Sequence, residues 1–128
     1  MSRLRILVGV AVLAGAILAI PVPAMAKGTD VIRTGSCSGS AHWKLKVGRD
    51  NGRWEVELEV DSNRIGQTWR VKIKSNGVIR YNRLKVTQAP SGSLTARKRV
   101  PDVAGTDRIV ARARNVASGQ LCVARLTI

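Results

Sequence analysis

From residue 42 to residue 128, apolar and polar residues alternate along short segments that are rich in β-branched residues. A period of two places successive side chains on opposite faces of an extended strand, so each segment predicts a β-strand with one buried face. Clusters of Gly, Asn, Asp and Ser separate the segments and indicate turns. The pattern predicts seven strands, at residues 42–47, 53–60, 68–74, 78–87, 93–100, 107–115 and 121–128.

Seven short strands with closely spaced turns favour an all-β, antiparallel sandwich of two sheets. The pair Asn76 and Gly77 suits a tight hairpin between the third and fourth strands, because both central residues of such a turn need a positive φ. Strands one and two, three and four, and six and seven then form hairpins, and the fifth strand pairs with the second. This is the connectivity of an immunoglobulin-like (fibronectin type III-like) sandwich, and a closed barrel is the alternative fold.

Residues 1–26 predict a cleavable signal peptide. Arg3 and Arg5 precede an uncharged apolar run that ends at residue 20, and residues 24–26 fit the small-x-small cleavage pattern. The run is shorter than the roughly 20 residues that span a bilayer, and a retained membrane anchor is the alternative. We therefore expect a secreted chain that starts at Lys27, without stable insertion of the mature chain in a membrane. Residues 27–40 would be an N-terminal segment tied by a disulfide, and residues 41–128 the sandwich.

Cys37 and Cys122 are the two cysteines of the chain. Pairing is the default outcome in the oxidising environment of an exported protein, and two free thiols or an intermolecular bridge are the alternatives. One histidine and two cysteines do not complete a tetrahedral metal shell without carboxylates. We expect a Cys37–Cys122 disulfide, no metal site and no cofactor.

Five short runs resemble small secreted immunoglobulin-like proteins of high-GC Gram-positive bacteria. They are CSGS at 37–40, WKL at 43–45, GQTWRV at 66–71, PSGSL at 90–94 and SGQLC at 118–122. The similarity covers the whole mature chain, and its motifs are turns, core tryptophans and the cysteine pair. The resemblance therefore implies a fold and export, and it transfers no active site.

Alternation also assigns the charged residues to faces. Glu55, Glu57 and Glu59 point outward from the second strand, between basic rows on its neighbours, so we expect the charges of that sheet to be balanced by cross-strand pairs. The strands of the other sheet contain no glutamate, and their outward basic residues are the candidate residues for binding an anionic partner. These are Arg70, Lys72, Lys74, Arg80, Arg108, Arg112, Arg114 and Arg125. Lys85 would join this face across a β-bulge near Arg83, because the apolar positions change parity between Tyr81 and Leu84.

The chain holds 22 basic and 8 acidic residues, and the loss of Arg3 and Arg5 with the signal peptide leaves a net charge of +12. A field of this sign attracts polyanions. We expect an anionic cell-wall polymer or another secreted protein as the partner, and a secreted protein in loose association with the cell wall. A basic composition that merely keeps an exported protein soluble is the competing interpretation, and the oligomeric state is left open.

We expect no catalytic residues and no enzyme activity. His42 is the single histidine, and the sequence does not indicate a nucleophile beside a carboxylate-held base. Specific nucleic-acid binding is not expected, because Trp43, Trp54 and Trp69 take core-facing positions and do not form an exposed stacking platform. A secreted inhibitor or small-ligand carrier that acts through loops 61–66 and 100–106 is the alternative function, and a weak hydrolase is the third.

Overall fold

The computed structural model describes residues 15–16 and 30–128 of the chain. Apart from residues 15 and 16, the predicted signal peptide lies outside the described residues. Among those residues, no helix has the length and apolar character needed to cross a membrane.

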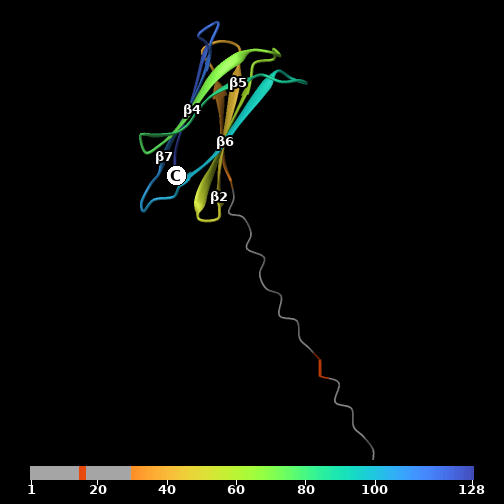
Figure 1. Ribbon diagram of the computed structural model, residues 1–128. Coiled ribbons are helices and arrows are strands. Elements are labelled where there is room, and N and C mark those ends of the chain that lie inside the picture. The colour runs from red at the N-terminus through yellow and green to blue at the C-terminus, as the bar shows by residue number, and fades with distance from the viewer. Residues whose placement is uncertain (1–14, 17–29) are drawn as a thin grey trace, which may run out of the picture.

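The described part of the chain forms a sandwich of two antiparallel sheets, each with four strands (Figure 1). The first sheet has the order β1-β2-β3-β6 and the second has the order β5-β4-β7-β8. The strands are β1 (Val31–Ser36), β2 (His42–Asp50), β3 (Arg53–Asp61), β4 (Thr68–Ser75), β5 (Val78–Val86), β6 (Ser93–Pro101), β7 (Arg108–Asn115) and β8 (Leu121–Thr127). The ladders do not close into a ring within residues 30–128, so the fold is a sandwich and not a barrel.

The described structure has eight strands, whereas the sequence pattern predicts seven. The additional strand is β1, which lies in the segment expected to be an N-terminal lead-in and pairs with β2 along its whole length. Its inward positions are Val31, Arg33 and Gly35, which do not form an apolar series. Gly35 is required because the indole of Trp43 lies where a Cβ would be. The strand is therefore set by its neighbour and not by its own periodicity.

The core lies between the two sheets and follows the predicted alternation. Leu45, Leu58, Trp69 and Ile73 are among its largest fully buried side chains. Trp54 is also buried, as expected. Trp43 is only half-buried: it packs against the core at the margin beside β1.

The disulfide between Cys37 and Cys122 is present, with the two Cα atoms 4.2 Å apart. It joins the chain after β1 in the first sheet to β8 in the second sheet. The backbone N–H of Ser38 donates to the carbonyl of Leu121, and the N–H of Leu121 donates to Ser38 Oγ. This side of the sandwich is thus closed by a covalent bond and hydrogen bonds.

The β4–β5 hairpin confirms the predicted turn and corrects the predicted bulge. Asn76 and Gly77 have φ values of 51° and 79°, as the tight turn requires. Ile73 pairs with Tyr81 and Lys74 pairs with Ile79, so the extra residue is Arg80 and the bulge near Arg83 was a wrong prediction. The parity of β5 changes before Tyr81, because this places the aromatic ring against the core.

Candidate anion-binding face

The outer face of the second sheet carries its cations in two central columns, on β4 and β7. Register places three cross-strand rows on it, in the order β5, β4, β7, β8: Leu84, Arg70, Arg114 and Leu121; Asn82, Lys72, Arg112 and Val123; Ile79, Lys74, Val110 and Arg125. Arg108 lies opposite Thr127 on the same face. We call the following seven residues the basic face: Arg70, Lys72, Lys74, Arg108, Arg112, Arg114 and Arg125. They comprise seven of the eight predicted anion-binding residues.

The two sheets differ in how their charges are balanced. The strands of the second sheet contain ten basic and no acidic residues. Those of the first sheet contain eight basic and five acidic residues. The positive charge of the described chain is therefore concentrated on one half of the sandwich, as the alternation predicts.

The glutamate row of β3 is paired within the first sheet. Glu57 accepts from Arg97 at 2.8 Å and lies 3.9 Å from the ammonium of Lys46. Arg99 binds Asp50 at 2.7 Å. Every ion pair within residues 30–128 lies outside the basic face, so its cations have no acidic partner in the described structure.

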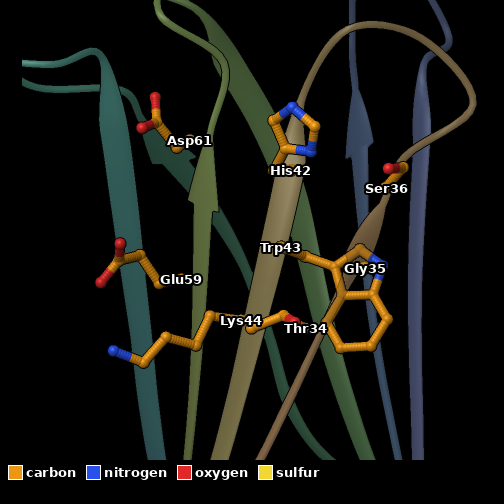
Figure 2. Close-up of a pocket in the computed structure, with 8 residues that line it drawn as sticks. All are labelled: Thr34, Gly35, Ser36, His42, Trp43, Lys44, Glu59 and Asp61. Carbon is orange, nitrogen blue, oxygen red and sulfur yellow. The ribbon is translucent and has the colours of Figure 1, made fainter.

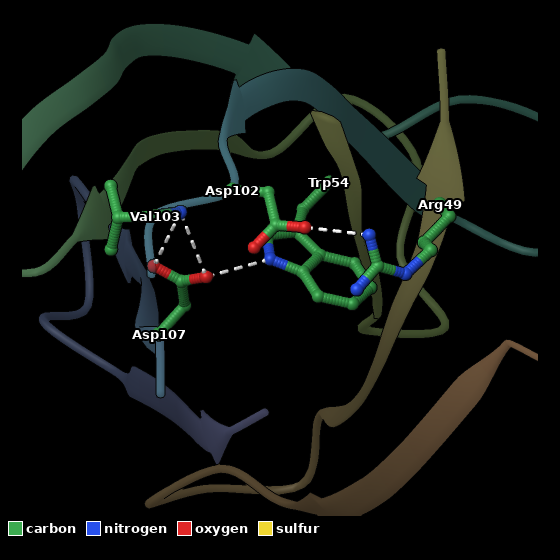
Figure 3. Close-up of polar contacts among 5 residues, drawn as sticks. All are labelled: Arg49, Trp54, Asp102, Val103 and Asp107. Atoms are coloured by element: carbon green, nitrogen blue, oxygen red, sulfur yellow. Dashed lines mark hydrogen bonds and ion pairs between the residues drawn. The ribbon is translucent and has the colours of Figure 1, made fainter. Parts of the chain in front are cut away.

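Asp102 and Asp107 are the acidic residues nearest to β7 in sequence, and both are engaged elsewhere (Figure 3). Asp102 accepts a hydrogen bond of 2.6 Å from Arg49, whose guanidinium lies 4.4 Å from the ring centroid of Trp54. Asp107 is fully buried and accepts from Trp54 Nε1 at 2.8 Å. These two carboxylates fix the end of the sandwich and leave the basic face uncompensated.

Asp107 is held as an anion by its hydrogen bonds. Donation from the Asn76 side chain at 2.8 Å, followed by that from Trp54, lowers the pKa of Asp107 below its ordinary value, while desolvation opposes the shift. The N–H of Val103 adds a weaker donor. Asn76 Oδ1 also accepts from the N–H of Arg108, so one turn residue positions both the carboxylate and the start of β7. Sequence reasoning assigned Asn76 to the turn and did not find this second role.

The basic face sets like charges directly opposite one another. Arg70 is paired with Arg114, and Lys72 with Arg112. Directly opposite residues on an antiparallel sheet have Cβ atoms about 5 Å apart, so like charges there destabilise the sheet. The arrangement lowers stability, which a purely structural role for these residues does not explain.

We expect Lys72→Glu to raise the free energy of unfolding by about 0.5–1 kcal/mol, because it replaces a repulsive cross-strand pair by an attractive one. Lys46→Glu is the matched change on the first sheet, where the residue lies opposite Glu57, and it should lower stability by a similar amount. Urea unfolding of the two variants measures this difference. Equal destabilisation by both changes would contradict the charge imbalance between the sheets.

Arg80 is the predicted anion-binding residue that the structure does not place with the others. As the bulge residue of β5, it lines a groove beside β6 together with Arg83 and Lys98. Lys85 pairs with Trp69, whose side chain is in the core, so it lies on the inward side of the edge strand and not on the basic face. The one-residue displacement of the bulge produces both differences.

Exposed aliphatic residues border the basic face, a feature that sequence reasoning missed. Leu84 and Ile79 on β5 are 53% and 50% exposed. The sequence pattern suggested core positions for such residues, but the bulge at Arg80 turns them outward. Leu121 and Val123 form the opposite border on β8 and are half-buried.

A shallow hollow of about 410 Å³ lies at one end of the first sheet (Figure 2). Figure 2 shows the imidazole of His42 between Ser36 and Asp61, and register places these three residues in one cross-strand row. In the described chain, His42 makes no hydrogen bond to either neighbour, and Asp61 accepts from the N–H of Asn63. The hollow contains three residue types of a hydrolase without the contacts that would join them.

The two loops of the alternative function do not form one site. Asp61 pairs with Ser93 at one end of the β3–β6 ladder, and Arg53 pairs with Pro101 at the other. Loops 61–66 and 100–106 therefore begin at opposite ends of the sandwich. No family model, curated protein or solved structure matches this chain, so its function is argued from the fold and from these surfaces.

Proposed function

We propose that this protein is a secreted, non-catalytic binding module that holds an anionic cell-envelope polymer on its basic face. The strand orders β2-β3-β6 and β5-β4-β7-β8 support an immunoglobulin-like, fibronectin type III-like arrangement with β1 added at one edge. In such a module the sheet supplies a rigid, broad surface, and the partner is recognised by side chains on that surface. A polymer of repeated phosphate or carboxylate groups fits a surface with repeated cations.

The observation on which this proposal rests is the absence of acidic residues from all four strands of the second sheet. A chain that is basic by composition alone would distribute its few acids without regard to the sheets. Here the described acids gather on the first sheet and in loops, although Arg70 and Arg114, and Lys72 and Arg112, would each be stabilised by an acid nearby. A partner that supplies the missing negative charge accounts for this arrangement.

The salt dependence of binding tests the proposal. Each cation that neutralises a phosphate releases a counterion and adds about 0.7 to the slope of log K against log salt for a flexible polyanion. Contacts from all seven residues of the basic face would give a slope of about −5. We expect the exported protein to stay bound to immobilised polyphosphate above about 0.2 M salt, where the Debye length is already below about 8 Å. Elution below that concentration, or a slope of about −1, would contradict the proposal.

A further inference from the structure

A cationic groove of about 510 Å³ lies between the edge strands of the two sheets, β5 and β6. Two runs of sequence line it: Arg80, Tyr81, Asn82 and Arg83 on β5, and Arg97 and Lys98 on β6. The groove opens on the side of the sandwich opposite the disulfide, because β1 and β8 form the other pair of edges. It contains four basic residues and no acidic one.

The fold gives this groove its charge through inward-pointing residues on both edges. Lys98 lies opposite Val56, and Arg83 lies opposite Val71, so both occupy positions that face the core side of their sheets. Inward charges on edge strands prevent edge-to-edge pairing, and this purpose would be served as well by an acid on one strand and a base on the other. Both strands instead supply cations, which repel one another across the groove.

Three of the four cations remain available to a ligand. Arg97 is bound to Glu57 and lies 3.8 Å from Glu55. Arg80, Arg83 and Lys98 have no ion pair within residues 30–128, and all three are exposed. The guanidinium of Arg83 lies 5.8 Å from the ring centroid of half-buried Tyr81, a cation–π geometry that holds its head group at the groove.

The groove is continuous with the basic face through Asn82. This residue lines the groove, pairs with Lys72 across β4, and accepts a hydrogen bond of 2.9 Å from Arg70. The path from β7 over β4 and β5 to β6 covers two strand spacings and one separation of stacked sheets, about 20 Å in total. Cations are present at both ends of this path, and exposed Asn82 lies at the bend.

We propose that the groove is a second anion-binding site, which holds phosphate groups of the same polymer where it passes around the edge strand β5. The inference rests on the proposed function for the identity of the polymer, whereas the groove as an anion site depends only on Arg80, Arg83 and Lys98. A long polyanion contacts the face and the groove together. A short one occupies one surface at a time.

The test compares long-chain polyphosphate with tripolyphosphate on three pairs of substitutions that remove the same charge. The groove variant is Arg83→Gln with Lys98→Gln, the face variant is Arg112→Gln with Arg114→Gln, and the control is Arg33→Gln with Arg53→Gln on the first sheet. All six side chains are exposed, so the variants should fold, and circular dichroism verifies this. We expect the groove variant to weaken binding of the long chain by about tenfold and to reduce its salt slope by about 1.4, with a smaller effect on tripolyphosphate.

Two results would overturn the inference. If the groove variant matches the first-sheet control with both probes, only net charge matters and the groove is not a site. If it weakens both probes equally, the groove does not share one polymer with the face. A groove effect without any effect of the face variant would overturn the proposed function and leave the groove as an independent site.

Discussion

Removing the Cys37–Cys122 disulfide is expected to lower the free energy of unfolding by about 4–5 kcal/mol. The bond spans 85 residues, so it closes most of the described chain into one loop and restricts the unfolded state strongly. It also ties the first sheet to β8 beside the N-terminal strand that the sequence pattern does not support by itself. Domains of this size have a total stability of about 5–15 kcal/mol, so the loss is a large part of the total.

Urea unfolding of the oxidised protein, the reduced protein and the Cys37→Ala, Cys122→Ala variant measures this loss. The reduced protein keeps both side chains and isolates the effect of the crosslink, whereas the double variant also removes two sulfur atoms from the margin of the core. We expect both to unfold at lower urea concentration, with the double variant slightly less stable. A change of less than about 1 kcal/mol on reduction would show that the crosslink does not limit the unfolded state.

The strands and the distribution of charge could be read from the sequence because both depend on local alternation. In β3, Trp54, Val56, Leu58 and Val60 are buried while the glutamates between them pair with cations on β2 and β6. The basic face followed in the same way, since a period of two fixes which side chains share a surface. Seven of its eight predicted members are brought together by the register.

The features that the sequence did not predict depend on tertiary contacts. β1 has a glycine, an arginine and a threonine among its residues, and it becomes a strand because β2 offers an unpaired edge and Trp43 needs the space above Gly35. The bulge at Arg80 depends on where Tyr81 fits the core. A parity change shows that a bulge exists, but it does not fix the residue at which the bulge falls.

The groove between β5 and β6 was missed for the same reason. Sequence reasoning recognised that Lys98 breaks the inward pattern of its strand and placed it at the sheet margin, and the structure shows Arg83 at the facing margin. No pattern within either strand indicates that these two margins meet. Their proximity follows from the packing of the two sheets.

Neutralising the centre of the basic face should weaken polyanion binding by about 100-fold or more. The variant changes Arg70, Lys72, Arg112 and Arg114 to glutamine, which removes both repulsive cross-strand pairs and four of the seven cations. Its stability should rise, because like charges no longer lie opposite one another. Loss of binding in a more stable protein separates this effect from unfolding.

A control variant changes Arg33, Lys44, Arg53 and Arg64 to glutamine and so has the same net charge. These exposed cations lie on the first sheet or in the loop after it. Interactions between charges more than a Debye length apart, about 8 Å at 0.15 M salt, are largely screened, so the control should keep most of its affinity.

The dissociation constants of these two variants for long-chain polyphosphate at 0.15 M salt test the account most directly. If the basic face is the binding surface, the face variant loses about two orders of magnitude in affinity and the control variant stays close to the unaltered protein. Equal losses in the two variants would contradict the account, because they would show that total charge alone, and not its position on the second sheet, governs binding.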